Sequence, residues 1–171
     1  MWEDDYCQVE VISASNYDLV KRQTIEAIDF GNAHFNGIGF TALYQRENIP
    51  YPISQLLIPI ENFEAILAEN SFIRIDKIYY QYEGLVNHAE DVTRAYGDDD
   101  FSIWAEVKER ILTNIWITSR GANTDDRIIK ATSILNTMGE KYQLILVDWN
   151  SCEVIDLKEI NEVKAYLKER Y

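Results

Sequence analysis

Apolar and polar residues alternate at the start of the chain and then recur at helical spacing. Cys7, Val9 and Val11 alternate with polar residues, which predicts a β-strand. Ser15 stands where an N-cap would, with Asp18 three residues later, an arrangement that resembles a capping box. Helical spacing follows at Tyr17, Val20, Thr24, Ala27 and Ile28, so the pattern predicts a helix over about 16–30.

The next segment, residues 31–60, is broken by glycines at its start and by prolines near its end. Residues 40–44 and 56–60 are β-prone within it. Pro59 lacks a backbone N–H, so the second of these stretches is predicted at a sheet edge or at the end of a strand.

Two more elements follow before the acidic part of the chain. A short helix is predicted from Glu61, because Phe63, Ile66 and Leu67 fall on one helical face. Residues 72–82 are rich in β-branched and aromatic side chains and predict a long strand.

Residues 101–115 carry apolar side chains three or four positions apart. These are Phe101, Trp104, Val107, Ile111, Leu112 and Ile115. The spacing predicts an amphipathic helix. Asp98, Asp99 and Asp100 would precede it and face the positive end of its dipole, a favourable arrangement. Residues 115–118 are β-prone and predict a short strand.

The C-terminal third predicts a helix, a hairpin and a final helix. Thr124 is positioned to cap the first helix and Gly139 to end it, with Ile128, Ala131, Leu135 and Met138 on its apolar face. Residues 142–149 predict a buried strand, which turns at Asn150-Ser151 and pairs with residues 154–155. Asp156 and Glu159 then resemble a capping box at the start of the last helix.

Strands that interleave with helices predict an α/β or α+β fold. With no repeat, linker or low-complexity segment, residues 1–171 are expected to form a single acidic domain. We expect a central mixed β-sheet packed by about five helices.

Charge is the strongest global feature of the composition. Sixteen basic residues against 29 acidic ones give a net charge of −13. Such a surface repels nucleic acid and anionic membranes, so direct binding to either is not expected. A basic protein partner remains open, and so does acidity that serves solubility alone. With no basic and apolar leader at the N-terminus and only short apolar runs, we expect a cytoplasmic protein.

No motif in the chain predicts a catalytic or metal site. Gly37 and Gly39 lack the strand–helix context of a nucleotide-binding loop and are interpreted as turn glycines. His34, His88 and Asp148 are candidate catalytic groups without a partner at a recognisable spacing. The three acids at 98–100 do not match a calcium loop, and two cysteines are too few for a zinc site. We therefore expect no enzyme activity, no cofactor and no metal.

Acidic residues are most frequent in residues 83–106, where seven of them occur with one base, Arg94. Tyrosine and tryptophan often anchor interfaces, and acids around them speed the approach of a basic partner. We therefore expect a partner-binding surface made by Glu83, Glu90, Asp91, Tyr96, Asp98, Asp99, Asp100 and Trp104.

In overall character, the chain resembles the immunity proteins of bacterial polymorphic-toxin and contact-dependent growth inhibition systems. The likeness rests on the acidic stretch 83–106 and on the ending, in which the strand Leu144 to Trp149 turns into a last helix. It implies a small binding protein that neutralises a basic, nuclease-type toxin domain. A small enzyme using acidic residues, or an adaptor or structural subunit with generic acidity, are the alternatives.

Overall fold

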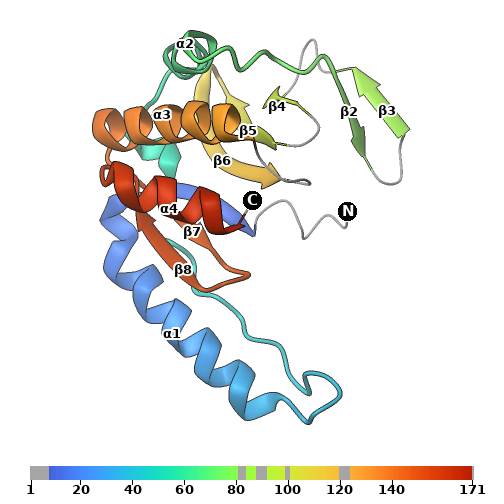
Figure 1. Ribbon diagram of the computed structural model, residues 1–171. Helices are drawn as coiled ribbons and strands as arrows, with labels where there is room; N and C mark the ends of the chain where they lie inside the picture. The colour runs from blue at the N-terminus through green and yellow to red at the C-terminus, as the bar shows by residue number, and fades with distance from the viewer. Residues whose placement is uncertain (1–7, 81–83, 88–91, 99–100, 120–123, 171) are drawn as a thin grey trace.

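The structure is a computed structural model that describes residues 8–80, 84–87, 92–98, 101–119 and 124–170. Its main sheet has six antiparallel strands in the order β4-β5-β6-β1-β7-β8 (Figure 1). These strands are β1 (Val9–Ser13), β4 (Thr93–Gly97), β5 (Phe101–Lys108), β6 (Ile111–Ser119), β7 (Leu144–Asp148) and β8 (Glu153–Asp156). A separate two-stranded sheet joins β2 (Lys77–Tyr80) to β3 (Gly84–Asn87).

The described residues contain four α-helices. They are α1 (Tyr17–His34), α2 (Ile60–Glu69), α3 (Asp125–Tyr142) and α4 (Ile160–Arg170), with short 3-10 helices η2 (Ala14–Asn16) and η3 (Ile53–Leu56). The fold is thus a single α+β domain, one of the two classes expected. The expected mixed sheet was wrong, because every pairing in the main sheet is antiparallel, and the expected five helices are four. None of these helices is long and apolar enough to cross a membrane.

The two faces of the sheet are covered unequally. Helices α2, α3 and α4 pack against one face and enclose the main core, which includes Val11, Leu144 and Leu146 (Figure 1). On the other face a small second core contains Ile12, Val20, Ile145 and Val147, with α1 supplying Val20. Strand β7 is buried along its whole length because successive residues enter the two cores in turn.

The predicted helix over 101–115 was wrong, because this segment is the hairpin of β5 and β6. Phe101, Ile103, Ala105 and Val107 alternate into the main core, so period-two patterning decides the structure. Lys108 pairs with Ile111, which leaves a two-residue turn at Glu109 and Arg110. Both turn residues have positive φ, 52° and 66°, as the tight turns of right-twisted hairpins require.

The predicted helix over 16–30 is confirmed and extends to His34. The predicted capping box was wrong, because η2 intervenes and Ser13 instead accepts a hydrogen bond from the Ser15 N–H. Asn16 precedes α1, and its buried amide bonds both the N–H and the C=O of Tyr51. This clamp fixes the start of α1 to a segment 35 residues away in the chain.

The remaining local predictions had different outcomes. Thr124 caps α3 as predicted, accepting from the Arg127 N–H at 3.3 Å. Residues 40–44 are not a strand, and 58–60 pair with the start of β6 through one isolated bridge, Pro59 with Ile111, in keeping with a proline at the end of a strand. The capping box at Asp156 was wrong: its carboxylate accepts from the Lys158 N–H, and α4 begins at Ile160.

Gly139 does not end α3, which continues to Tyr142 before Gln143 adopts a left-handed conformation. Instead it lets α3 approach the segment between β8 and α4. A Cβ added at Gly139 would lie 2.5 Å from the Cβ of the fully buried Leu157. No van der Waals contact is this short, so glycine is required here by packing.

We predict that Gly139→Ala destabilises the fold by about 2–3 kcal/mol, through overpacking. Helix propensity alone would stabilise the variant by about 1 kcal/mol. Urea denaturation measures the difference, with Ser133→Ala at an exposed position of α3 as the control. A Gly139→Ala protein as stable as the wild type would contradict the packing described here.

Candidate functional site

The acidic turn between β4 and β5 holds the first of the predicted partner-binding residues. Asp98 lies in this turn and not at a helix start, because Gly97 has a φ of +115° and β5 begins at Phe101. One carboxylate oxygen of Asp98 accepts from the Phe101 N–H at 3.0 Å. The other accepts from the Arg127 guanidinium at 2.9 Å. Asp98 therefore stabilises the turn while its side chain stays about half exposed.

This ion pair joins two acidic segments that are distant in sequence. Arg127 lies in the first turn of α3, directly after the exposed Asp125 and Asp126. Lys130, one turn further along, is paired with Asp126 at 2.7 Å. The acids at the start of α3 therefore lie beside the β4–β5 turn, with the nearby bases already engaged in ion pairs. Sequence reasoning missed this juxtaposition, because nothing in the local pattern links Asp98 to Arg127.

Tyr96 lies in the core and is 2% exposed, so its ring does not offer the surface that an interface anchor needs. It packs edge-on against Phe63, with ring centroids 5.7 Å apart. Its hydroxyl donates to Glu64 at 2.7 Å, and Arg94 donates to the same carboxylate oxygen at 2.9 Å. Burial, together with the hydrogen bond to Glu64, raises the pKa of Tyr96 well above its ordinary value.

Trp104 points to the opposite face of the sheet from Tyr96. It pairs with Ala95 across β4 and β5, whereas Tyr96 pairs with Ile103, and successive residues of a strand alternate between faces. The Trp104 ring is partly exposed and stacks on Trp116 with centroids 5.9 Å apart. Its indole N–H lies 2.8 Å from the Ser102 hydroxyl and 3.0 Å from that of Thr118. The structure therefore does not bring the two predicted aromatic anchors together.

The other predicted site residues, Glu83, Glu90, Asp91, Asp99 and Asp100, lie outside the described residues, as does His88. Their partner-binding role stays a prediction, supported by their sequence neighbourhood alone.

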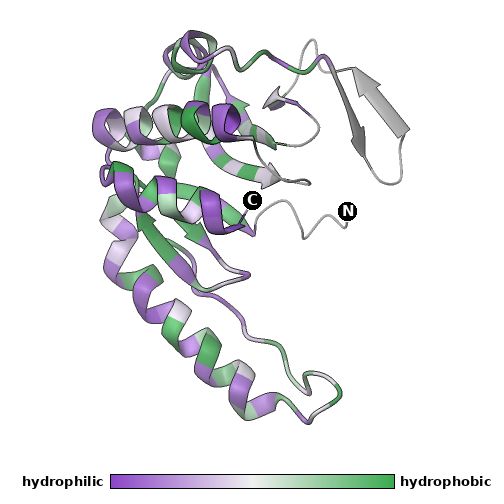
Figure 2. Ribbon diagram, viewed as in Figure 1, coloured by the Kyte–Doolittle hydropathy of each residue, from purple (hydrophilic) through white to green (hydrophobic). Residues whose placement is uncertain are grey.

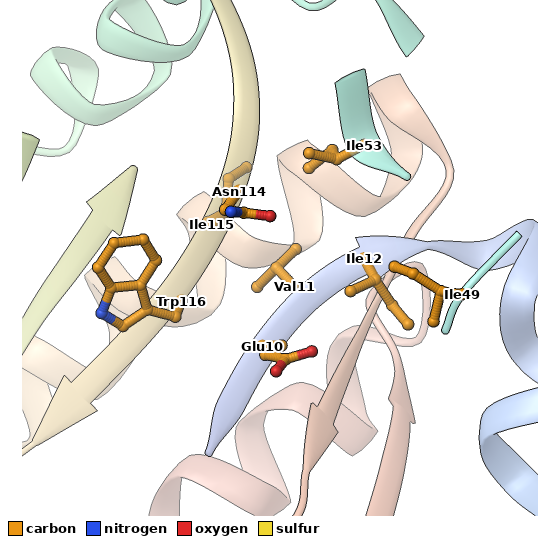
Figure 3. Close-up of a pocket in the computed structure, with 8 residues that line it drawn as sticks. All are labelled: Glu10, Val11, Ile12, Ile49, Ile53, Asn114, Ile115 and Trp116. Atoms are coloured by element: carbon orange, nitrogen blue, oxygen red, sulfur yellow. The ribbon is translucent and has the colours of Figure 1, made fainter. Parts of the chain in front are cut away.

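A small hollow lies where residues 49–53 cross the sheet. Figure 3 shows the residues that line it: Glu10, Val11 and Ile12 of β1, Asn114, Ile115 and Trp116 of β6, and Ile49 and Ile53 of the crossing segment. Its volume is about 110 Å³, enough for a few water molecules. The lining is apolar apart from Glu10, Asn114 and the Trp116 indole N–H, which gives little to hold a reactive substrate.

A second hollow of about 410 Å³ adjoins the first through Glu10 and Ile49. We call residues 41–52, which run back from the far end of α1, the strap. Strap residue Arg46 stacks over Trp149 at 4.4 Å and pairs with Glu10 at 3.2 Å. Glu47 of the strap pairs with Arg22 of α1. The charged groups that line this hollow are thus paired with one another or with α1, and within the part of the chain that the structure describes no His, Cys or Ser lines either hollow.

The candidate catalytic residues occupy structural positions. His34 stacks on Phe30 at the end of α1, and its Nδ1 lies 2.8 Å from the Phe30 carbonyl oxygen. Asp148 is 3% exposed and accepts from the Tyr166 hydroxyl and from the backbone N–H groups of Asn150 and Ser151. Among the described residues, no group of three His, Cys, Asp or Glu side chains is arranged to hold a metal ion.

Compared with known proteins, the chain matches no protein-family model, and neither a curated protein nor a solved structure matches it. Function is therefore inferred from the geometry and charge of this chain alone.

A surface feature that sequence reasoning missed is an exposed apolar region in residues 25–43. The helical pattern assigned Ile28 to the inward stripe of α1, but its side chain is 48% exposed. Ile25 and Phe35 are also about half exposed, and Ile38 almost fully. The available signal was that α1 carries more apolar positions than one helical face can bury.

The hydrogen bond from Tyr96 to Glu64 generates a prediction on pH. Tyr96→Phe should cost about 1.5–3 kcal/mol near neutral pH, because it removes a buried hydrogen bond to a carboxylate. Because the pKa of Tyr96 is higher in the folded state, its hydroxyl ionises first in the unfolded state. This ionisation favours unfolding once the pH exceeds 10. Wild-type stability should therefore fall as the pH rises above 10, and its advantage over Tyr96→Phe should shrink.

Urea denaturation of both proteins at pH 8 and pH 11 measures this advantage. An advantage that stays constant or grows between these pH values would contradict the buried position of the hydroxyl.

Proposed function

We propose that this chain is a non-catalytic cytoplasmic binding protein that captures a basic protein partner, most specifically an immunity protein that neutralises a nuclease-type toxin domain. The observation that carries the proposal is the ion pair between Asp98 and Arg127. It fixes the acidic β4–β5 turn beside Asp125 and Asp126 and so extends the acidic surface beyond the stretch expected from sequence.

Charge supports this partner class. A nuclease cleft is basic because it binds a polyanion, and a chain of net charge −13 is attracted to it over long range. Electrostatic complementarity of this kind speeds association and selects against acidic partners. The proposed contact surface comprises Asp98, Asp99, Asp100, Asp125 and Asp126, with Glu83, Glu90, Asp91 and Trp104 as further predicted contacts.

The positions of the candidate catalytic groups also support a binding role. Asp148 has both carboxylate oxygens engaged by Tyr166 and by backbone N–H groups, and His34 lies on a different element, at the end of α1. The charges around the larger hollow are paired within the protein. These arrangements favour surface recognition over chemistry on a bound substrate.

The test uses the product of the reading frame next to this chain's gene, which the proposal expects to be a basic toxin domain. We predict nanomolar binding that weakens as salt rises, because the attraction is between opposite charges. Asp99→Lys with Asp100→Lys should slow association about tenfold or more, with a smaller effect on dissociation. Asp98 is left unchanged, because its carboxylate stabilises the turn. Surface plasmon resonance at several salt concentrations separates the two rates.

The matched control is Glu162→Lys with Glu169→Lys, two exposed positions of α4 that change the net charge by the same amount. Equal slowing by both pairs would show that only total charge matters. No binding to the neighbouring gene product, or a neighbouring product that is not basic, would contradict the proposed function.

A further inference from the structure

The second half of α1 extends beyond the body of the protein. The buried residues of α1 are Val20, Gln23 and Thr24, and no residue from 25 to 34 is fully buried. Figure 1 shows this half of the helix and the loop after it at the end of the molecule opposite α2 and α3. We call residues 25–43 the arm. Figure 2 shows hydrophobic residues along it.

One exposed stripe of the arm has the spacing of a helix-pairing seam. Ile25, Ile28 and Asn32 lie at intervals of three and four residues, and Phe35 follows three residues later, directly after the helix. These intervals correspond to alternating a and d positions of a heptad. Asn32 would occupy an a position, where a single asparagine commonly fixes the register between two helices.

The loop at the tip enlarges this apolar surface. Phe40 contacts Phe35, with ring centroids 5.4 Å apart, and approaches Gly31 of the helix. Ile38 and Leu43 are 96% and 94% exposed. A fully exposed side chain of this size presents on the order of 200 Å², so the exposed apolar residues of the arm together present roughly 800 Å². The largest apolar patch on a monomer is typically about 300–600 Å², whereas a stable interface buries about 800 Å² per partner.

The segment that contains the arm is nearly balanced in charge, although the arm itself carries two acids, Glu26 and Asp29, and no lysine or arginine. Residues 17–47 carry four acids and three bases, a net charge of −1, whereas the whole chain carries −13. Arg22 pairs with Glu26 and Glu47, so these charges of α1 and the strap are already paired. With Glu26 paired to Arg22, Asp29 is the remaining acid of the arm, so a second copy of the chain meets little repulsion here.

We propose that this chain forms a homodimer in which two arms pack antiparallel about a two-fold axis. Such an axis places the same apolar patch on both sides of the interface. Pairing over residues 25–35 would hold the two acidic bodies at opposite ends of roughly 15 Å of helix. That separation exceeds the screening length of about 8 Å at physiological ionic strength, so repulsion between the bodies is largely screened. The strap braces the arm through Tyr44, which donates to Glu26, so the arm is ordered before it pairs.

Sedimentation equilibrium over a range of protein concentrations tests the dimer. We expect a monomer–dimer equilibrium with Kd below roughly 10 µM, which tightens or stays constant as salt rises because the two copies carry the same charge. Ile28→Asp should weaken dimerisation about 100-fold or more, because it places a carboxylate in the apolar seam. Leu43→Asp is a second variant at a side chain that is 94% exposed, and it should weaken the dimer without affecting the monomer fold.

Ile129→Asp is the matched control, an isoleucine of α3 that is 60% exposed and lies outside the arm. It should leave the dimer unchanged, and circular dichroism verifies that each variant is folded. A protein that stays monomeric at all concentrations, a dimer indifferent to Ile28→Asp and Leu43→Asp, or a dimer that dissociates as salt rises would each overturn the proposal. The toxin-binding proposal stands or falls separately, because its complex weakens with salt.

Discussion

One helix packs on the second face of the sheet, over β1, β7 and β8, and it is fixed to the body at one end. The sheet's central strands have apolar side chains on both faces, so each face must be covered. Three helices cover the first face, whereas the second depends on α1, whose Val20 meets Ile12, Ile145 and Val147. Asn16 fastens the start of α1 to Tyr51. Beyond Thr24 no residue of the helix is fully buried, and the arm results from this arrangement.

The strap is the second consequence of the same arrangement. A chain that leaves the body along α1 must return, and residues 41–52 do so along the helix and across the sheet. Several of the strap's contacts are polar and at least partly exposed: Glu47 with Arg22, Arg46 with Glu10, and Tyr44 with Glu26. Exposed pairs of this kind contribute little stability, and they pack less closely than apolar side chains would. The two hollows that meet at Glu10 and Ile49 lie beneath this segment.

Local pattern predicted the elements whose apolar residues follow one clear pattern along their length. The period of α1 and the uniform burial of β7 are of this kind. The β5–β6 hairpin was missed because Trp104 lies on the opposite face from Phe101 and Ile103 and mimics helical spacing. Glu109 and Arg110 concealed the turn, since neither residue type favours positive φ.

The candidate site was less predictable because it depends on tertiary contacts. Composition identified the acidic segment, but only the fold places Asp98 beside Arg127 and the acids of α3. Tyr96 resembled a surface aromatic in sequence and is buried because Glu64 and Phe63 meet it from α2. The arm was missed because a helical pattern does not reveal where the body of a protein ends.

Hydrogen–deuterium exchange of α1 tests most directly the claim that this helix is packed at one end and pairs at the other. Amides of residues 17–24 should be protected at every protein concentration, because their half of the helix packs against the body through Val20, Gln23 and Thr24. Amides of residues 25–34 should exchange faster at about 1 µM and gain protection at about 100 µM, where dimers predominate. Uniform protection along α1 that does not change with concentration would contradict the account.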